Sequence, residues 1–333
     1  MSQERTVLVS ILNWNTAGMT AECVASVLRL DRAPGLRLDV VVIDNASAPA
    51  DRAELDAALA AAPVTLLPQG RNLGFAGGHN VAIRHAIASG ADYVWLVNSD
   101  ALLAPDTMNR LVALMEADPR CGSSSPVVRA LHDDQRMDFC GARRDWRALD
   151  SQRPGTMEEA RALEAAHPDD MWLAGTVIMF RVAALRQVGE LNEKLFAYFE
   201  DDDIGVRLSR GGWTNRLAYD AVARHAQPDV KERAPHYFYL LYRNAFLFWT
   251  ENTPPPYRRF LRLRLLDRAL FTANRLFDRG LTQKAEACLL GAYDGLQGRG
   301  GPVDLQRRPP LAIRLLCGLL RVKHYRRLRW YRA

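Results

Sequence analysis

Four consecutive carboxylates, Glu200 to Asp203, are the residues of this chain whose types and spacing point most directly to chemistry. Adjacent like charges repel one another, so a folded chain keeps them together where solvent, a cation or a reaction uses them. They follow an aromatic-rich run, Phe196 to Phe199, rather than lying in a polar tail. A carboxylate in such a place can accept a proton or help to hold a metal. The alternative is a solvated helix N-terminus, where acids complement the helix dipole, and the cluster alone favours neither.

Two further acidic positions stand where apolar runs end. At the first, the Asp44 carboxylate can accept hydrogen bonds from a nucleobase imide or a ribose hydroxyl. An Asx turn or a helix cap is the alternative there and is the stronger one when the residue is taken alone. At the second, Asn98 and Asp100 are two residues apart, so both side chains can point to one side and hold a divalent cation. The alternative is a turn into a helix opened by Pro105.

A glycine-rich segment runs from Gly70 to Asn80. Glycines let the backbone approach a ligand closely, and the N-terminus of the following helix favours anionic groups. Arg71 could pair with a phosphate. The spacing is not the G-x-G-x-x-G fingerprint, and the segment follows the third strand-like run, which argues against a dinucleotide dehydrogenase. The alternative is a long turn with a glycine cap.

Two candidates later in the chain carry weaker signals. His225 could complete a metal shell, although a lone histidine is more often packed or exposed without a ligand. Trp172 and Gly175 could form the floor of an acceptor site, and a buried strand explains the same residues equally well.

Alternating strand and helix patterns must position these residues. Buried-strand runs occupy residues 6–12, 38–43, 64–67 and 93–97, and helical spacing occupies residues 20–30, 50–62 and 79–89. This order predicts an α/β fold with a Rossmann-like, mostly parallel sheet and helices on both faces. Ligands of such sheets bind at the carboxyl ends of the strands, where Asp44, the glycine-rich segment and Asp100 fall.

The middle of the chain has a different character. Residues 132–168 are rich in charge and proline with weak periodicity, which predicts a variable insertion or flexible connection with a helix near residues 157–166. A strand is expected within residues 172–180. A helix is expected from the acidic cluster to about Arg210, where two glycines stop it.

The composition of the chain indicates its size class and the cellular compartment in which it is expected. The chain has 333 residues, 48% of them hydrophobic, which suffices for one large domain or two smaller ones. Its five scattered cysteines contain no C-x-x-C pair, which argues against a disulfide framework or structural zinc and favours a reducing compartment. No signal-peptide pattern and no membrane-spanning run is visible, so a cytoplasmic location is expected.

Charge divides the chain into two parts. Residues 1–230 carry 23 Lys and Arg against 31 Asp and Glu, a net charge of −8, whereas residues 231–333 carry 21 against 7, a net charge of +14. We therefore expect an α/β domain at 1–230 and a helical, basic, amphipathic region at 231–333. The basic part suggests an anionic partner, and its amphipathic helices favour an anionic membrane surface over nucleic acid. The alternative is a helical subdomain that only packs on the core.

Taken together and in this order, these segments resemble glycosyltransferase family 2, whose enzymes have a GT-A fold. The rhamnosyltransferase-like subgroup, which builds bacterial surface polysaccharides, is the nearest in pattern. The resemblance covers about residues 5–230. It rests on Ile11–Asn15, Val42–Ser47, Asn72–Asn80, Leu96–Asp100, and Phe199–Asp203 with Arg207, Gly212 and Trp213. Asn98 departs from the strict D-x-D pattern of the family, which weakens the metal inference more than the family assignment.

The resemblance implies a nucleotide-sugar site. Asp44 would contact the nucleobase with Trp14 beside it, and Asp100 would reach the sugar nucleotide and its metal. The expected donor-binding residues are Asn13, Trp14, Asp44, Arg71, Asn72, Gly74, Gly77, Gly78, Asn80, Asn98 and Asp100. A divalent cation, Mg²⁺ or Mn²⁺, would be held by Asp100 and His225.

The resemblance also divides the acidic cluster. Asp201 is implied as the general base that deprotonates the acceptor hydroxyl, and Glu200 would orient acceptor hydroxyls together with Trp172 and Gly175. Asp203 is expected to pair with Arg207 four residues on. Asp202 would then be the most replaceable of the four.

The function implied is an inverting glycosyltransferase that moves a sugar from dTDP-rhamnose or a UDP-sugar to a hydroxyl of a glycan or lipid-linked acceptor in cell-surface polysaccharide synthesis. A nucleotidyltransferase on a related fold is disfavoured, because Asn13-Trp14-Asn15 stands where such enzymes place a phosphate loop. A non-catalytic module is disfavoured by the joint presence of Asp44, Asp100 and Asp201. Peripheral attachment to the inner face of the cytoplasmic membrane is expected, no nucleic-acid partner is expected, and a homodimer is left open.

Overall fold

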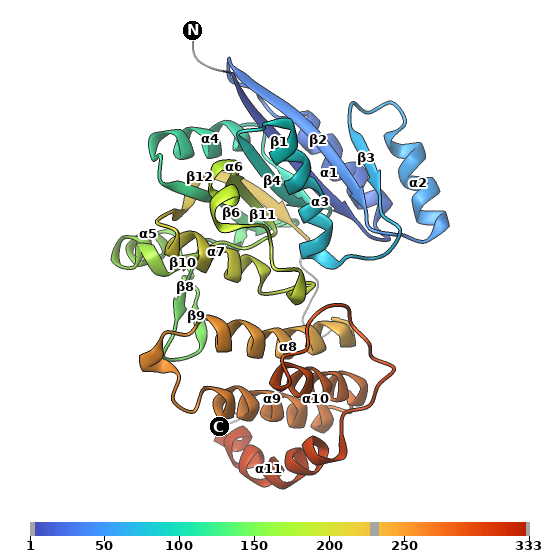
Figure 1. Cartoon of the computed structure of the whole chain (residues 1–333), viewed down its shortest axis with the longest axis vertical. Helices are drawn as coiled ribbons and strands as arrows, with labels where there is room; N and C mark the ends of the chain where they lie inside the picture. Colours follow the sequence, from blue (N-terminus) through green and yellow to red (C-terminus); the bar gives the residue numbers. More distant parts are fainter. Residues whose placement is uncertain (1–3, 227–232, 331–333) are drawn as a thin grey trace. The chain divides into compact units, whose positions relative to one another are not determined.

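The computed structural model describes residues 4–226 and 233–330 (Figure 1). The chain forms two compact units. One comprises Met1–Asn192 with Glu200–Gln227, and the other comprises Glu193–Phe199 with Pro228–Ala333. The short segment Glu193–Phe199 therefore groups with the C-terminal helices, which the sequence did not predict.

A nine-stranded sheet, in the order β3-β2-β1-β4-β11-β6-β12-β5 with β7 on β6, organises the first unit. Its strands are β1 (Arg5–Asn13), β2 (Leu36–Asp44), β3 (Thr65–Pro68), β4 (Tyr93–Asn98), β5 (Ala101–Leu103), β6 (Cys121–Ala130), β7 (Asp133–Phe139), β11 (Val177–Arg181) and β12 (Thr214–His225). From β3 to β4 all neighbours are parallel. Beyond β4 the sheet is mixed, because β11 runs antiparallel to both β4 and β6.

The predicted α/β class is confirmed, and the sheet is parallel from β3 to β4 and again between β6 and β12, with antiparallel pairs elsewhere. Parallel neighbours need a crossover connection, usually a helix. The chain reaches β11 from a small separate sheet instead of from such a helix, and β11 enters between β4 and β6 in the opposite direction.

Helices cover both faces of the sheet, as predicted. They are α1 (Ala17–Leu28), α2 (Pro49–Leu59), α3 (Gly74–Ser89), α4 (Thr107–Ala117), α6 (Val182–Val188) and α7 (Glu200–Arg210). Side chains of β1 alternate between two apolar layers: Val7, Val9 and Ile11 pack with α1, α2 and α4, whereas Leu8 lies in the layer that contains α3, α6 and α7. Each helix buries one apolar stripe against the sheet.

Residues 132–168 are regular structure, so the predicted flexible connection is wrong. They form β7, the strands β8 (Ala142–Asp145) and β9 (Asp150–Gln152), and the helix α5 (Met157–Ala166). Strand β10 (Met171–Trp172) follows and completes a three-stranded antiparallel sheet with β8 and β9. The helix lies where it was predicted, and its N-terminus is capped by the Thr156 hydroxyl, which accepts the Glu159 N–H at 3.1 Å.

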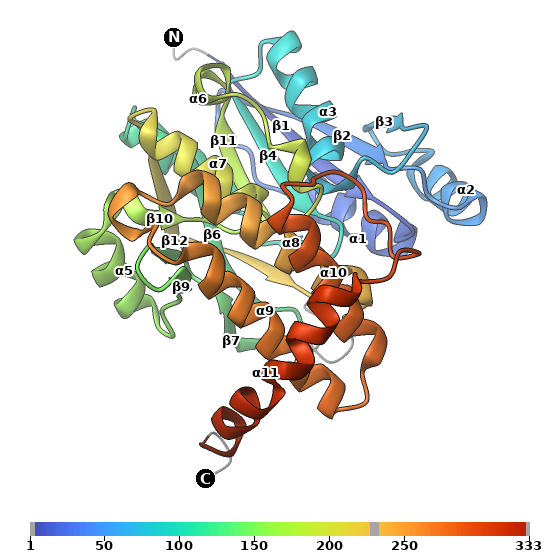
Figure 2. The same cartoon turned by 60° about the horizontal axis from the view of Figure 1, so that its bottom comes forward.

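The second unit is helical, as expected from the sequence: α8 (Pro235–Asn252), α9 (Leu261–Asp278), α10 (Thr282–Leu296) and α11 (Leu311–Trp330) (Figure 2). Helices α8 and α10 meet at backbone distance, because a Cβ on Gly291 would lie 2.2 Å from the Tyr239 carbonyl oxygen and one on Gly295 would lie 2.7 Å from the Arg243 carbonyl oxygen. Within the described residues, none of the helices combines the length and apolarity that crossing a bilayer requires.

Candidate active site

The ends of β1 and β2 hold a network centred on Asn13. Parallel pairing sets Asn13 beside Asp44, and the Asn13 amide donates to Asp44 Oδ1 at 3.1 Å and to Asp51 Oδ2 at 3.0 Å. The Asn13 carbonyl oxygen accepts from the Thr20 hydroxyl at 2.7 Å. Because Asn13 is fully buried with both ends of its amide engaged, it orients Asp44. Trp14, the residue after Asn13, is 47% exposed.

A second amide network fixes the start of α3. The Asn72 side-chain oxygen accepts the Gly74 N–H at 2.8 Å and the Asn45 amide at 3.0 Å. The Asn45 side-chain oxygen in turn accepts the Leu73 N–H at 2.9 Å. Gly74 has φ of 74°, a conformation that favours glycine. Asn45 was not among the predicted site residues, although its position directly after Asp44 was a signal for it.

The second half of the glycine-rich segment belongs to a helix, so the helix predicted for residues 79–89 starts earlier than expected. Helix α3 begins at Gly74, so Gly77 and Gly78 lie in its first turns. A Cβ on Gly78 would come within 2.4 Å of Leu12 Cδ1, so this glycine lets α3 pack closely on β1. Packing thus accounts for Gly78, and its contact with a donor remains a prediction.

Asn80 and Arg71 differ in their surroundings. The Asn80 amide is buried and binds the backbone of Leu191 at both ends, donating to its carbonyl at 2.9 Å and accepting its N–H at 3.0 Å. These bonds join α3 to the segment after α6. Arg71 is exposed just before α3 and is therefore accessible to an anionic group.

Asp100 and His225, the two predicted metal ligands, are brought together. Strands β5 and β12 pair antiparallel with Ala101 opposite His225, and His225 Nε2 lies 3.1 Å from Asp100 Oδ1. The side-chain oxygen of Asn98, two residues before Asp100, is buried and has no hydrogen-bond partner among the described residues. The same is true of both ring nitrogens of His225. In the part of the chain described, no group of three or more His, Cys, Asp and Glu side chains gathers as a metal centre.

The acidic cluster forms the first turn of α7, and one of its members is set apart. Asp201 Oδ2 accepts the Gly175 N–H at 2.9 Å, and its Oδ1 accepts the Asp202 N–H at 2.8 Å. Asp201 is half-buried, whereas Glu200, Asp202 and Asp203 are buried. A carboxylate held by two backbone donors and still accessible is suited to accept a proton.

Burial and charge separate the protonation states of Glu200 and Asp201. Burial, and then the charge of Asp201, raises the pKa of Glu200 well above its usual range. Burial also raises the pKa of Asp201, but the two N–H donors and the positive charge of Arg153 oppose that rise. Of two adjacent carboxyls that share a site, the better stabilised one ionises first. We therefore expect Asp201 to ionise at a lower pH than Glu200.

Asp202 and Asp203 each pair with an arginine. Arg144 Nε donates to Asp202 Oδ1, with both side chains buried, and burial raises the pKa of Asp202 to about 6 against the opposing charge of Arg144. Gly205 makes room for this arginine, since a Cβ there would lie 2.5 Å from an Arg144 nitrogen. This buried ion pair argues against the expectation that Asp202 is the most replaceable of the four. Asp203 binds Arg207 at 2.9 Å, as predicted.

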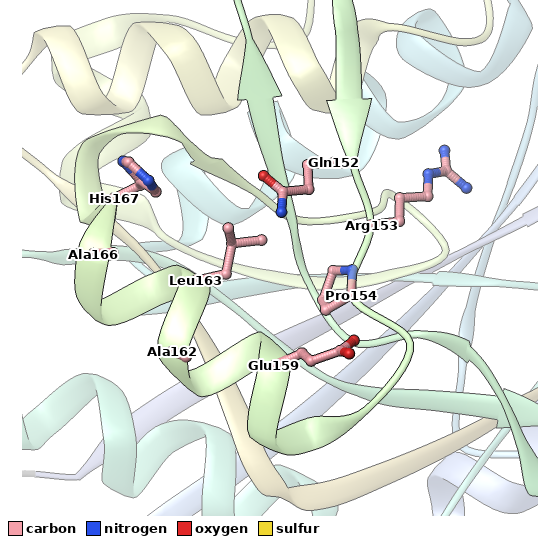
Figure 3. A pocket seen from close by; sticks show the side chains of 8 residues that line it. All are labelled: Gln152, Arg153, Pro154, Glu159, Ala162, Leu163, Ala166 and His167. Carbon is pink, nitrogen blue, oxygen red and sulfur yellow. The ribbon is translucent and has the colours of Figure 1, made fainter.

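The predicted acceptor residues lie in different surroundings. Gly175 adjoins Asp201, but Trp172 is buried in the small sheet, and its Nε1 donates to the Ser151 hydroxyl at 3.2 Å. Beyond β9 lies an open cavity of about 490 Å³ that contains none of the predicted site residues (Figure 3). It is lined by Gln152, Arg153, Pro154, Glu159, Ala162, Leu163, Ala166 and His167.

The chain is an α/β protein whose candidate ligand site lies at the carboxyl edge of its parallel strands. The family model described as "Glycosyltransferase like family 2" matches residues 4–241. The chain belongs to this family, which confirms the resemblance seen in the sequence.

Similarity to individual proteins is more distant. The chain is 28% identical over 189 residues to the N-acetylglucosaminyl-diphospho-decaprenol L-rhamnosyltransferase of Mycobacterium tuberculosis, a match that covers 52% of this chain and 62% of that protein. It is 29% identical over 219 residues to the galactofuranosyltransferase GlfT1 of Mycolicibacterium smegmatis, covering 64% and 68%. The match thus spans less than two thirds of the length of the first of these relatives.

Among solved structures, the mannosyltransferase PcManGT of Pyrobaculum calidifontis, in complex with GDP-Man and Mn²⁺, has a similar fold. The TM-score is 0.58 at 19% sequence identity, with 89% of this chain and 88% of that chain covered. At this identity the similarity supports the predicted fold class.

Proposed function

We propose that this protein is an inverting glycosyltransferase in which Asp201 is the general base. The observation that carries the proposal is the Asp201 carboxylate, which is fixed by the N–H groups of Gly175 and Asp202 in the one residue of the acidic cluster that is not fully buried. An acceptor hydroxyl is a poor nucleophile, and a nearby carboxylate makes it a better one by accepting its proton as the new bond forms.

In the proposed reaction, the acceptor oxygen bonds to the anomeric carbon of the donor sugar as the bond to the nucleoside diphosphate breaks. The proton of the hydroxyl passes to Asp201, and the leaving diphosphate keeps the electron pair of the broken bond. One base on the acceptor side and direct displacement give inversion at the anomeric carbon. Glu200, in its protonated form, can donate a hydrogen bond to an oxygen of the acceptor.

The donor is proposed to bind at the ends of β1 and β2. Asp44, oriented by Asn13, offers an acceptor for a nucleobase or ribose. Trp14 offers an exposed ring for stacking, and Arg71 offers a positive charge for the diphosphate. Because the relatives are named for L-rhamnosyl and galactofuranosyl transfer, we propose dTDP-rhamnose or a UDP-sugar as donor and a glycan or lipid-linked hydroxyl as acceptor.

The proposed function is tested by incubating the protein with a panel of nucleotide sugars and lipid-linked acceptors. Release of nucleoside diphosphate that requires both substrates supports it. Pyrophosphate release from a nucleoside triphosphate would support a nucleotidyltransferase instead, and binding of nucleotide sugar without turnover of any acceptor would support a non-catalytic module.

We further propose that Asp100 and His225 hold a divalent cation, which would neutralise charge on the donor diphosphate. A carboxylate can bind either Mg²⁺ or Mn²⁺, whereas an imidazole ligand favours the transition metal Mn²⁺ over Mg²⁺. The side chains of Asp100 and His225 are adjacent, and the His225 nitrogens have no hydrogen-bond partner in the described residues. The pair is therefore suited to hold a divalent cation.

His225→Ala is expected to weaken Mn²⁺ binding by about tenfold or more, because one of the two ligands is lost. Calorimetric titration of Mn²⁺ in the presence of a nucleoside diphosphate measures the change. His85→Ala, at an exposed histidine of α3, is the matched control and should bind Mn²⁺ normally. Full activity of the wild-type protein in excess EDTA would remove the cation from the proposal.

The last part of the proposal is peripheral attachment to an anionic membrane at its cytoplasmic face through α11. Leu311, Leu315, Leu319 and Val322 are 66%, 58%, 78% and 67% exposed, and their spacing of four, four and three places them on one face of the helix. Basic residues lie on the same helix, including Arg314 and Arg321. An apolar stripe beside basic side chains is typical of helices that lie on anionic bilayers.

Leu319→Glu should lower binding to phosphatidylglycerol vesicles by about tenfold or more, since a buried leucine contributes about 1.5–3 kcal/mol. Co-sedimentation at physiological salt measures this, with phosphatidylcholine vesicles as the neutral comparison. Met19→Glu, an equivalent change at a 44% exposed residue of α1, is the control. Failure of the wild-type protein to bind anionic vesicles would end this part of the proposal.

A further inference from the structure

The residues directly before the acidic cluster have a backbone conformation that non-glycine residues rarely adopt. Phe196, Tyr198 and Phe199 have φ of 64°, 70° and 73°. Bulky side chains disfavour this left-handed region, and such residues persist only where their surroundings determine the conformation. The next residue, Glu200, begins α7. A costly conformation thus immediately precedes the two carboxyls of the proposed reaction.

Asn244 of α8 binds this segment through its carbonyl groups. It is fully buried, and its side-chain amide nitrogen lies 2.7 Å from the Leu195 carbonyl oxygen, 2.8 Å from that of Ala197 and 2.8 Å from that of Tyr198. The two N–H groups of this amide therefore donate to three carbonyl oxygens, so one N–H is shared between two of them. These contacts specify the path of the backbone residue by residue.

Arg243, the neighbouring residue of α8, also binds this segment, and we call Arg243 and Asn244 together the clamp. Arg243 is also fully buried. Its Nε donates to Asn244 Oδ1 at 2.9 Å, which orients the amide, and its guanidinium donates to the Leu195 carbonyl at 3.0 Å and to the Gly301 carbonyl at 2.6 Å. An arginine fork that satisfies carbonyls of two separate segments fixes one against the other.

Two aromatic contacts with α8 hold the side chains of the same segment. The ring of Tyr198 meets that of Tyr237 edge-on with centroids 5.1 Å apart. The ring of Phe199 lies 5.4 Å from that of Phe248. Backbone and side chains of Glu193–Phe199 are therefore both determined by α8.

We propose that Arg243 and Asn244 are positioning residues for the reaction: they hold Phe196–Phe199 in its costly conformation and thereby set the start of α7, on which Glu200 and Asp201 lie. The coupling passes through the peptide bond between Phe199 and Glu200. Without the clamp, the segment relaxes toward ordinary φ values, and α7 begins from a different backbone direction. The bonds from Gly175 and Asp202 to the Asp201 carboxylate then lose their geometry. This inference rests on the proposed role of Asp201.

The test replaces Asn244 by aspartate, which keeps the size of the side chain but removes both donors. We expect kcat of the full-length protein to fall about 100-fold, because a small displacement of a reacting group has an effect of this order. The dissociation constant for nucleoside diphosphate should stay within about twofold of wild type, since donor residues lie elsewhere. Arg243→Lys, which keeps the charge and loses the fork, should give a smaller fall in kcat and guards against an Asn244 variant that does not fold.

Asn274→Asp is the matched control. Asn274 is a buried asparagine of α9 in the same unit, and its amide donates to the Cys317 carbonyl at 3.0 Å. Both aspartate variants should lower the melting temperature, but only Asn244→Asp should lower kcat. Equal losses of kcat in the two variants, or a wild-type kcat in folded Asn244→Asp and Arg243→Lys, would overturn the proposal.

A double-mutant cycle separates this inference from the proposed function. In an Asp201→Asn background, Asn244→Asp should have no further effect on the residual rate, because the base that the clamp positions is absent. If Asp201→Asn alone turns over normally, the proposed base is wrong. If Asp201→Asn is inactive while Asn244→Asp and Arg243→Lys are fully active, the base stands and only the positioning role fails.

Discussion

Asp201→Asn is expected to lower the rate of sugar transfer by about 10³-fold, within the range that general base catalysis contributes. Asparagine has nearly the same shape and can still accept the Gly175 N–H that Asp201 Oδ2 accepts at 2.9 Å. It cannot take a proton from the acceptor. Donor affinity should therefore be unchanged, and single-turnover kinetics with a separate donor titration measure the two quantities.

Glu200→Gln is the control for this substitution. Glu200 retains its proton to a higher pH than Asp201, because burial and the Asp201 charge raise its pKa. Glutamine resembles the protonated acid and should preserve most of the activity. An Asp201→Asn variant that transfers sugar at the wild-type rate would contradict the assignment of the base.

The pH profile gives an independent reading of the same group. A base is active when deprotonated, and burial raises the pKa of Asp201. Activity should therefore be complete above the raised pKa and fall as the pH drops through it, at a higher pH than for an ordinary aspartate near about 3.9. The kcat/KM of Asp201→Asn should lack this acidic limb.

Asp202→Ala is expected to lower the free energy of unfolding by about 3–5 kcal/mol, because it leaves a buried arginine without its counter-ion. Arg144 is 1% exposed, so bulk solvent does not reach it to replace the lost carboxylate. Urea denaturation measures the difference. A much smaller effect is expected at Asp39, whose ion pair with Arg37 is exposed: Asp39→Ala should cost at most about 1 kcal/mol.

The paired replacement sharpens this test. Arg144→Met combined with Asp202→Leu removes both charges and fills similar space, so it should recover much of the loss seen in Asp202→Ala. An Asp202→Ala protein as stable as Asp39→Ala would show that the buried pair does not matter for stability.

The strand-end residues could be predicted because parallel strands leave a clear signal. Asp44 and Asp100 each follow an apolar run, and the edge at which such runs end is where ligands bind. The position at which α3 begins could not be predicted from such a pattern. Glycine has low helix propensity, so a helix beginning at Gly74 depends on tertiary contacts: the Asn45 and Asn72 bonds, and the close packing of Gly78 on β1.

Arg144, the partner of Asp202, and the two α8 residues Arg243 and Asn244 could not be predicted from the sequence for a different reason. Arg144 lies in a charged, aperiodic stretch, and its partner Asp202 is 58 residues away, so no local pattern connects them. Arg243 and Asn244 were hidden because most of their hydrogen bonds go to backbone carbonyls, which every residue has. Burial of a polar side chain in a helix marks such a role only once the fold is known.

Because Glu193–Phe199 group with the C-terminal helices, the unit that carries the proposed active site is not one continuous stretch of chain that could be separated from the helical unit. The chain passes from one unit to the other at residues 192/193, 199/200 and 227/228. A protein cut after residue 227 would keep every predicted donor and catalytic side chain and lose Arg243 and Asn244. Exchanging the helical region between related enzymes would therefore change more than the proposed membrane attachment, because any substitute must also supply the contacts to the seven residues Glu193–Phe199.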